Sequence, residues 1–226
     1  MCGVNITDRI HTLARISPLP LDTKCPQDKN SPKRKLIMLR QKSISLRLIR
    51  DERDCRIMIE AYNEILERAQ TDHTEIKSLK TILKDFDKDG FWSDDRGTML
   101  IIGPDDEIIG SIHFNRCSEF ELEIGYRIYR QKERGHGYMR EALPLFSAYL
   151  FETKAIRRLR LQTASDNVGS RKVAESSGYK REGVLRQAYF YRGKMCDSII
   201  YGLLREECIL FTELMTDSDN SKFINR

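Results

Sequence analysis

The sequence predicts a mixed α/β domain in which helices flank a sheet. Three observations support this fold class. An extended apolar stretch ends at a charged loop that contains glycines, a helix begins directly after that loop, and strands and helices then alternate along the chain. A chain of 226 residues fits one or two domains, and the patterned part has the size of a single core.

The first part of the chain lacks this pattern. We expect residues 1–42 to form a basic, mobile arm or linker. Residues 17–42 hold few large apolar side chains and four prolines with lysines between them, at positions 18, 20, 26 and 32. Residues 1–16 have the apolar spacing of a short helix that is marginally stable by itself. A pair of helices is expected between about Glu52 and Phe86.

Residues 127–140 are the most informative part of the chain, and they predict a phosphate-binding loop. Gly135 and Gly137 lie one residue apart, so the backbone can turn tightly with its N–H groups facing inward, and the following helix adds the positive end of its dipole. A dinucleotide-binding loop would need a third glycine where Arg140 stands, and no P-loop Gly-Lys-Ser/Thr is present. An ordinary strand-to-helix turn is the alternative interpretation.

The elements after the loop alternate in a recognisable order. Apolar residues recur at helical spacing after the glycines, although Pro144 would normally bend that helix. Alternating residues then predict strands, and polar residues predict the caps and turns between them. The expected elements are a helix at 138–153, a strand at 158–163, a cap at 165–167 before a short helix ending at Gly178, a strand at 179–191, a turn at 192–194 and a strand at 197–204.

Five short motifs in this order resemble the GNAT acetyltransferases, and within them the branch related to the ribosomal-protein N-acetyltransferases. The succession is more specific than any single motif, and the resemblance covers residues 43–206, which we take as the acetyltransferase domain. Residues 207–226 are expected to form a short helical extension and a disordered tail. The motifs are Glu-Ile-Gly-Tyr at 123–126, Arg-Gly-x-Gly at 134–137, Asn-x-x-Ser at 167–170, Ser-Gly-Tyr-x-Arg-Glu-Gly at 177–183 and Asp-x-x-x-Tyr at 197–201.

The resemblance implies a strongly twisted sheet with splayed central strands and an enzyme that uses acetyl-CoA as cosubstrate. It implies direct transfer of the acetyl group to a primary amine, on a protein amino terminus or a small molecule. Lys132 departs mildly from the family's loop pattern, in which Gln or Arg holds that position. The residues that the resemblance assigns to acetyl-CoA binding are Ile128, Tyr129, Arg130, Arg134, Gly135, His136, Gly137, Tyr138, Met139, Asn167 and Ser170.

The ribosomal-protein branch gives Ser170 the role of the acid that protonates the leaving thiolate. The alternative is that Asn167 and Ser170 only cap the helix, since both are preferred capping residues. The general base is less defined, because Tyr189 stands where that branch carries a carboxylate, and a neutral tyrosine is a poor base near pH 7. Glu123 and Glu182 are the nearby alternatives, and a water chain could also take the proton.

Other classes of site find little support in the sequence. The six cysteines form no Cys-x-x-Cys pair and the four histidines share no metal spacing, so we expect neither a metal site nor disulfides. His113 is interpreted as a packed or edge residue of a strand. No segment is long and apolar enough to cross a membrane, and no signal pattern begins the chain, so a cytoplasmic location is expected.

Residues 85–96 match the start of a calcium-binding loop, Asp-x-Asp-x-Asp-Gly, and need separate treatment. The twelfth position should hold a bidentate glutamate but holds Arg96, and a strand is expected after it in place of the second helix of an EF-hand. We therefore expect an ordinary charged loop here, or one that lines the acceptor groove with its acidic residues and Trp92.

Charge bears on the partners of the chain. The net charge of +5 is concentrated in residues 24–50, which contain nine lysines and arginines and a single acid, Asp28. Such a segment could contact nucleic acid or ribosomes, although no aromatic residues lie among its charges to stack on bases. A nucleic-acid-binding module and a catalytically silent acetyl-CoA sensor are thus alternative functions. The sequence leaves open whether the chain is a monomer or a homodimer.

Overall fold

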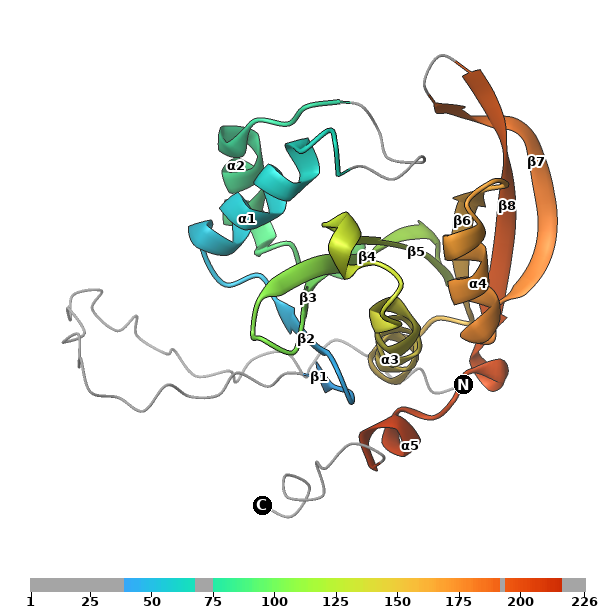
Figure 1. Cartoon of the computed structure of the whole chain (residues 1–226). Coiled ribbons are helices and arrows are strands. Elements are labelled where there is room, and N and C mark those ends of the chain that lie inside the picture. Colours follow the sequence, from blue (N-terminus) through green and yellow to red (C-terminus); the bar gives the residue numbers. More distant parts are fainter. Residues whose placement is uncertain (1–38, 68–74, 192–193, 217–226) are drawn as a thin grey trace, which may run out of the picture. The chain divides into compact units, whose positions relative to one another are not determined.

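The computed structural model describes residues 39–67, 75–191 and 194–216, all within one compact unit, Lys35–Arg226 (Figure 1). The expectations for residues 1–38, for the turn at 192–193 and for the tail from 217 lie outside the described residues. The helices are α1 (Glu52–Asn63), α2 (Leu79–Asp89), α3 (Tyr138–Thr153), α4 (Val168–Ser176) and α5 (Phe211–Thr216), with short 3-10 turns at Gln131–Glu133 and Arg205–Glu207. The strands are β1 (Leu39–Arg40), β2 (Ser45–Leu48), β3 (Arg96–Ile102), β4 (Ile108–Ser118), β5 (Glu121–Ile128), β6 (Arg158–Ala164), β7 (Lys180–Tyr191) and β8 (Lys194–Leu204).

The eight strands form one mixed sheet in the order β1-β2-β3-β4-β5-β6-β8-β7. Every neighbouring pair is antiparallel except β5 and β6, which run parallel and are joined through α3. The mixed α/β fold class predicted from the sequence is confirmed. The helix at Tyr138–Thr153 has the predicted bounds and continues through Pro144.

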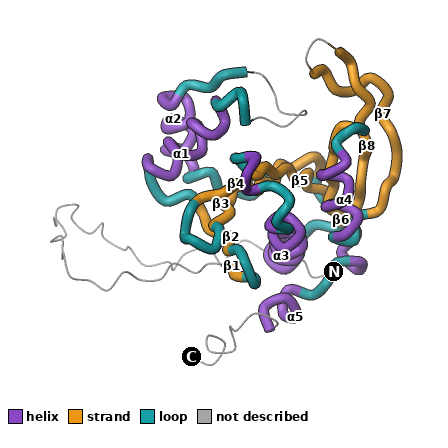
Figure 2. Tube along the Cα trace, in the orientation of Figure 1, coloured by secondary structure: helices purple, strands orange, loops and turns teal. Residues whose placement is uncertain are grey.

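Helices cover both faces of the sheet and define two hydrophobic cores. Met99 and Ile101 of β3 pack in the core that contains the buried side of α3, whereas Leu100 and Ile102 pack in the core formed with α1 and α2. This alternation follows from the two-residue period of a strand. Figure 2 shows α1 and α2 packed together, away from α3. The sheet therefore separates an α3 face from an α1–α2 face.

The two parallel strands separate partway along their length. Residues 121–124 of β5 pair with residues 158–161 of β6, but β5 continues to Ile128 with no further pairing to β6. Beyond Leu161, β6 keeps its pairing with β8 through Ala164. The predicted splayed strands are thus present, and we call the opening after Ile124 the fork.

Buried polar contacts fix the first helix against the sheet. Asp51 caps α1 by accepting a hydrogen bond from the Asp54 N–H at 3.0 Å. The buried carboxylate of Asp54 accepts two hydrogen bonds from the guanidinium of Arg47, at 2.5 Å and 2.9 Å. It also accepts one from the main-chain N–H of Arg50. Burial alone would raise the pKa of Asp54, but these hydrogen bonds from Arg47 and Arg50 lower it to about 2.

Two segments differ from the expectations. Leu39 and Arg40, in the predicted arm, form β1 on β2, and Leu39 is buried in the α3 core. Residues 85–89, predicted as the start of a loop, are the last turn of α2, which ends at Gly90 with φ +62°. Alternating aspartates suggested a loop, but the apolar face of α2 packs on β3 and extends the helix past them.

Candidate active site

The glycine loop has the backbone conformation that its sequence predicts. Gly135 and Gly137 both have φ +85°, in the left-handed region that side chains rarely adopt. No heavy atom lies within 4 Å of the position that a Cβ would occupy on either glycine. The glycines are therefore required by the turn itself, and open space lies beside them.

The main-chain N–H groups of residues 135–139 make no hydrogen bond with the described residues. Gly137 caps α3, and the first N–H groups of a helix have no partner inside it. Within the part of the chain that the structure describes, none of the N–H groups from Gly135 to Met139 donates a hydrogen bond. Such a row of donors at a helix amino terminus has the electrostatics of an anion site.

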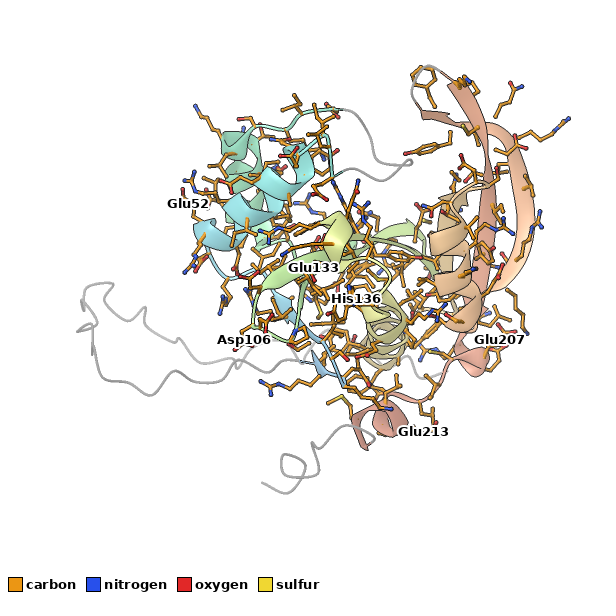
Figure 3. All side chains as sticks on the ribbon, in the orientation of Figure 1. Glu52, Asp106, Glu133, His136, Glu207 and Glu213 are labelled. Atoms are coloured by element: carbon orange, nitrogen blue, oxygen red, sulfur yellow. The ribbon has the colours of Figure 1, made fainter. Side chains whose placement is uncertain are left out.

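Two side chains expected at this anion site bind the loop's own backbone. Arg134 donates to the carbonyl oxygens of Ile128 at 3.3 Å and Tyr129 at 3.4 Å, and it also bonds to the Glu67 carbonyl. His136, labelled in Figure 3, lies with Nε2 3.0 Å from the Lys132 carbonyl. Both side chains thus contact main-chain carbonyl groups in and beside the loop, and their assignment to acetyl-CoA binding stays a prediction.

The end of β5 presents main-chain groups to the fork. In an antiparallel pair the groups of alternate residues point to the same neighbour. The Tyr129 N–H donates to Ile109 of β4 at 2.9 Å, so the groups of Tyr126 and Ile128 point the other way, towards the fork. The Tyr129 side chain is buried, and its N–H is not available to a ligand. Arg130 follows at the surface, 3.8 Å from Glu107.

Ser170 lies on α4 and meets β5 through its hydroxyl. Asn167 caps α4 by accepting from the Ser170 N–H at 3.0 Å, so the capping role belongs to Asn167. The Ser170 hydroxyl lies 2.9 Å from that of Tyr126, which also lies 3.2 Å from the Ser170 carbonyl. Burial raises the pKa of Tyr126 to about 12. Sequence reasoning missed Tyr126 as a site residue, although it ends the Glu-Ile-Gly-Tyr motif.

The candidate bases have different surroundings. The Glu123 carboxylate accepts from Arg160 of β6 at 2.6 Å and 2.9 Å. Glu182 pairs with Arg158 at 2.5 Å on β6, farther from the fork. Tyr189 lies on β7, with its Cα opposite that of Cys196 on β8. Of the three, Glu123 lies nearest the fork in the register of the strands.

The segment that resembled a calcium loop is held by ion pairs and packing. Arg96 pairs with Asp89 at 3.0 Å, and Lys88 with Asp85 at 2.6 Å. The Trp92 ring packs edge-on against Phe114, with centroids 5.5 Å apart. Trp92 is partly buried and packs against the α3 core, and its place in an acceptor groove stays a prediction.

The described residues lack two further features. No group of three or more His, Cys, Asp or Glu side chains among them is arranged to hold a metal ion. No helix in the same part of the chain is long and apolar enough to span a membrane.

Comparison with known proteins agrees with this geometry. The family model described as "Acetyltransferase (GNAT) domain" matches residues 43–180. The chain is 29% identical over 110 residues to the uncharacterized N-acetyltransferase p20 of Bacillus licheniformis, covering 48% of this chain and 61% of that protein. It is 32% identical over 105 residues to the ribosomal-protein-serine acetyltransferase of Escherichia coli (strain K12), covering 46% of this chain and 58% of that protein.

A solved structure has the same fold. The spermidine N-acetyltransferase from Vibrio cholerae, in complex with CoA and spermine, superposes with a TM-score of 0.65 at 17% identity, over 73% of this chain and 96% of that one. The chain spans about three fifths of the length of the two curated relatives. Since the family model matches more than half of its residues, the chain belongs to the GNAT acetyltransferase family.

Proposed function

We propose that this chain is an N-acetyltransferase that moves an acetyl group from acetyl-CoA directly to a primary amine. The observation that carries the proposal is the placement of three parts around one opening of the sheet. These parts are the row of N–H groups at residues 135–139, the fork between β5 and β6, and the Ser170 hydroxyl held beside it by Tyr126.

The residues present fit the shape and charge of acetyl-CoA. The N–H groups of Gly135 to Met139 would bind its pyrophosphate, with open space at both glycines for the phosphate oxygens. The main chain of Tyr126 and Ile128, which points to the fork, would orient the pantetheine arm and bind the thioester oxygen, where negative charge develops during the reaction. Acetyl-CoA itself supplies the activated acetyl group and a thiolate leaving group.

Ser170 is the proposed proton donor to the leaving sulfur. Since the pKa of Tyr126 is about 12, its phenol keeps its proton at neutral pH. That proton can go to the Ser170 carbonyl, 3.2 Å away, or to the Ser170 hydroxyl, 2.9 Å away. When it goes to the hydroxyl, the Ser170 proton can point into the fork. Tyr126 thereby orients the donor, and Asn167 fixes the backbone that carries it.

The proton of the attacking amine needs an acceptor. Among the residues that the sequence suggested, Glu123 is favoured over Tyr189, since it is a carboxylate and lies on β5 next to the fork. Its carboxylate already accepts two hydrogen bonds from Arg160, at 2.9 Å and 2.6 Å. Direct transfer is favoured because the matched motifs between Glu123 and Gly183 contain no cysteine to carry the acetyl group.

The acceptor is proposed as the amino terminus of a protein or a small-molecule amine. Support comes from two similar proteins, a ribosomal-protein-serine acetyltransferase and a spermidine N-acetyltransferase. An assay of CoA release tests this proposal. We expect the chain to release CoA when the acceptor is a peptide that begins with serine, or when the acceptor is spermidine. If the chain binds acetyl-CoA but acetylates no amine, the alternative function as a catalytically silent acetyl-CoA sensor is favoured. Nucleic-acid binding without acetyl-CoA binding would favour the binding module.

A further inference from the structure

His113 lies on the α1–α2 face of the sheet at the level of the fork. It pairs with Gly125 of β5, the residue directly after the last β5 residue that pairs with β6. Its neighbours Ile112 and Phe114 pack in the α3 core, so strand alternation puts the His113 ring on the opposite face. Tyr126 packs on the α3 core and contacts Ser170, and it therefore lies on the other side of β5 from His113.

The missing side chain of Gly125 lets this ring extend across β5. A Cβ on Gly125 would lie 2.5 Å from Nε2 of His113 and 2.6 Å from its Cε1. The ring thus occupies the space above Gly125, next to the main chain that opens into the fork. Any larger residue at position 125 would push the imidazole away from the fork.

The imidazole is placed to exchange a proton. His113 is partly exposed, and no hydrogen bond joins its ring to a side chain or main-chain group in the described ranges. Burial lowers the pKa of His113, and Lys77 lowers it further, whereas Glu123 raises it. Burial has the largest effect, so the ring is neutral at pH 7, and Glu123 is positioned to stabilise the imidazolium once it forms.

Charged and titratable groups from each neighbouring element complete this environment. On β6, Arg160 holds Glu123 and also contacts Cys117 of β4 at 3.3 Å. On β3, Arg96 is neutralised by Asp89. Before α2, Lys77 lies 4.7 Å above the Tyr62 ring of α1. On β5, Arg127 lies two residues beyond Gly125, with its guanidinium 6.0 Å from the same Tyr62 ring.

We propose that Nε2 or Nδ1 of His113 accepts the proton that the acceptor nitrogen loses as it attacks the acetyl carbonyl. The inference rests on the proposed acetyltransferase function and names its general base. A nitrogen–carbon bond forms and the carbon–sulfur bond breaks. The nitrogen gives its proton to His113, and the sulfur takes one from Ser170. The proton acceptor and the proton donor thus lie on opposite faces of β5, so the amine enters from the α1–α2 face.

Replacement of His113 by glutamine tests this role. With a serine-initiated peptide, and with spermidine as a second acceptor, His113→Gln should lower kcat by roughly 10²- to 10³-fold at pH 7. The defect should shrink as the pH rises, since hydroxide then takes the proton. The increase in melting temperature on adding acetyl-CoA should be unchanged. Asn115→Gln is the matched control, because Asn115 is exposed on the same face of β4, and it should leave kcat unchanged.

Nuclear magnetic resonance of the His113 ring gives a readout that needs no turnover. In the wild-type chain without substrates, the ring should titrate below the ordinary histidine value of about 6.5. Glu123→Gln should lower that pKa further, because the Glu123 charge raises it. Gly125→Ala should keep His113 but displace its ring, and should reproduce much of the kcat loss.

The outcomes separate this inference from the function on which it rests. A His113→Gln variant that keeps kcat within threefold of an active wild-type chain would overturn the role of His113 and leave the acetyltransferase proposal intact. A ring that is protonated at pH 7 would also overturn it. Failure of the wild-type chain to acetylate any amine would overturn the proposed function and this inference together.

Discussion

The hydroxyl of Tyr126 on β5 lies 2.9 Å from the hydroxyl of Ser170 on α4, although 44 residues separate them in the sequence. This contact joins the strand that borders the fork to the helix that carries the proposed proton donor. Asn167 accepts the Ser170 N–H, so the serine hydroxyl is not needed to cap the helix. Ser170 is thereby free for a role in chemistry.

Ser170→Ala should lower kcat by roughly ten- to a thousandfold while acetyl-CoA affinity stays nearly constant, because a proton donor acts in the transition state. Rapid-quench kinetics and calorimetry would measure the two quantities. Asn167→Ala is the control for capping, and it should lower the free energy of unfolding by about 1 kcal/mol. An active, destabilised Ser170→Ala variant would assign Ser170 to the cap instead.

Tyr126→Phe should have a smaller effect than Ser170→Ala, since it removes only the hydrogen bond that orients the donor. A loss of roughly fivefold in kcat is expected, equivalent to one hydrogen bond of about 1 kcal/mol. In the Ser170→Ala background the same change should have almost no further effect on kcat. Independent, multiplying effects in that double-mutant cycle would contradict the coupling of the two hydroxyls.

Asp54 should make the free energy of unfolding decrease as the pH falls into the acid range. Its pKa is about 2 in the folded chain, against an ordinary value of 3.8, so its contribution is complete above about pH 4 and is lost as the pH falls towards 2. The contribution is on the order of 2 kcal/mol. Urea unfolding of the wild type and of Asp54→Asn should show a difference in free energy that narrows over this range. A constant difference from pH 6 to pH 2 would contradict the ion pair with Arg47.

The part of the arm that precedes β1 should be dispensable for acetylation of a small acceptor, whereas β1 itself should be needed for stability. A chain that begins at Ile37 should keep its turnover and its melting temperature. A chain that begins at Ser43 loses the buried Leu39, and removal of such a side chain typically costs about 2–5 kcal/mol of stability. Thermal unfolding of the two truncations compares them directly. Loss of turnover in a folded chain starting at Ile37 would make the arm part of the site.

The sequence predicted those features that depend on local pattern. The bounds of α3 follow from a glycine pair and helical periodicity, and the order of five motifs identified the family before any geometry was known. The fork came from the resemblance, because no local signal marks where two parallel strands separate. The backbone at Gly135 and Gly137 was predictable, since two glycines at this spacing favour left-handed turns.

The missed features depend on contacts between distant residues. The Tyr126–Ser170 pair and the His113 ring above Gly125 arise only when β4, β5 and α4 assemble. The hydrogen bond from Arg134 to the Ile128 carbonyl at the end of β5 was likewise not predicted. Such choices among competing partners are set by the tertiary fold and cannot be read from spacing.

The most direct measurement of the central claim is the change in melting temperature on adding acetyl-CoA to wild-type and Gly135→Glu chains. The wild type should be stabilised, whereas the glutamate puts a negative charge into the open space beside the N–H groups and should abolish the shift. Gly90→Glu is the matched control, because Gly90 also has a positive φ, +62°, but ends α2 away from the loop. It should lower the melting temperature and keep the acetyl-CoA shift. A folded Gly135→Glu chain that acetyl-CoA stabilises as much as the wild type would contradict the assignment of this loop as the phosphate site.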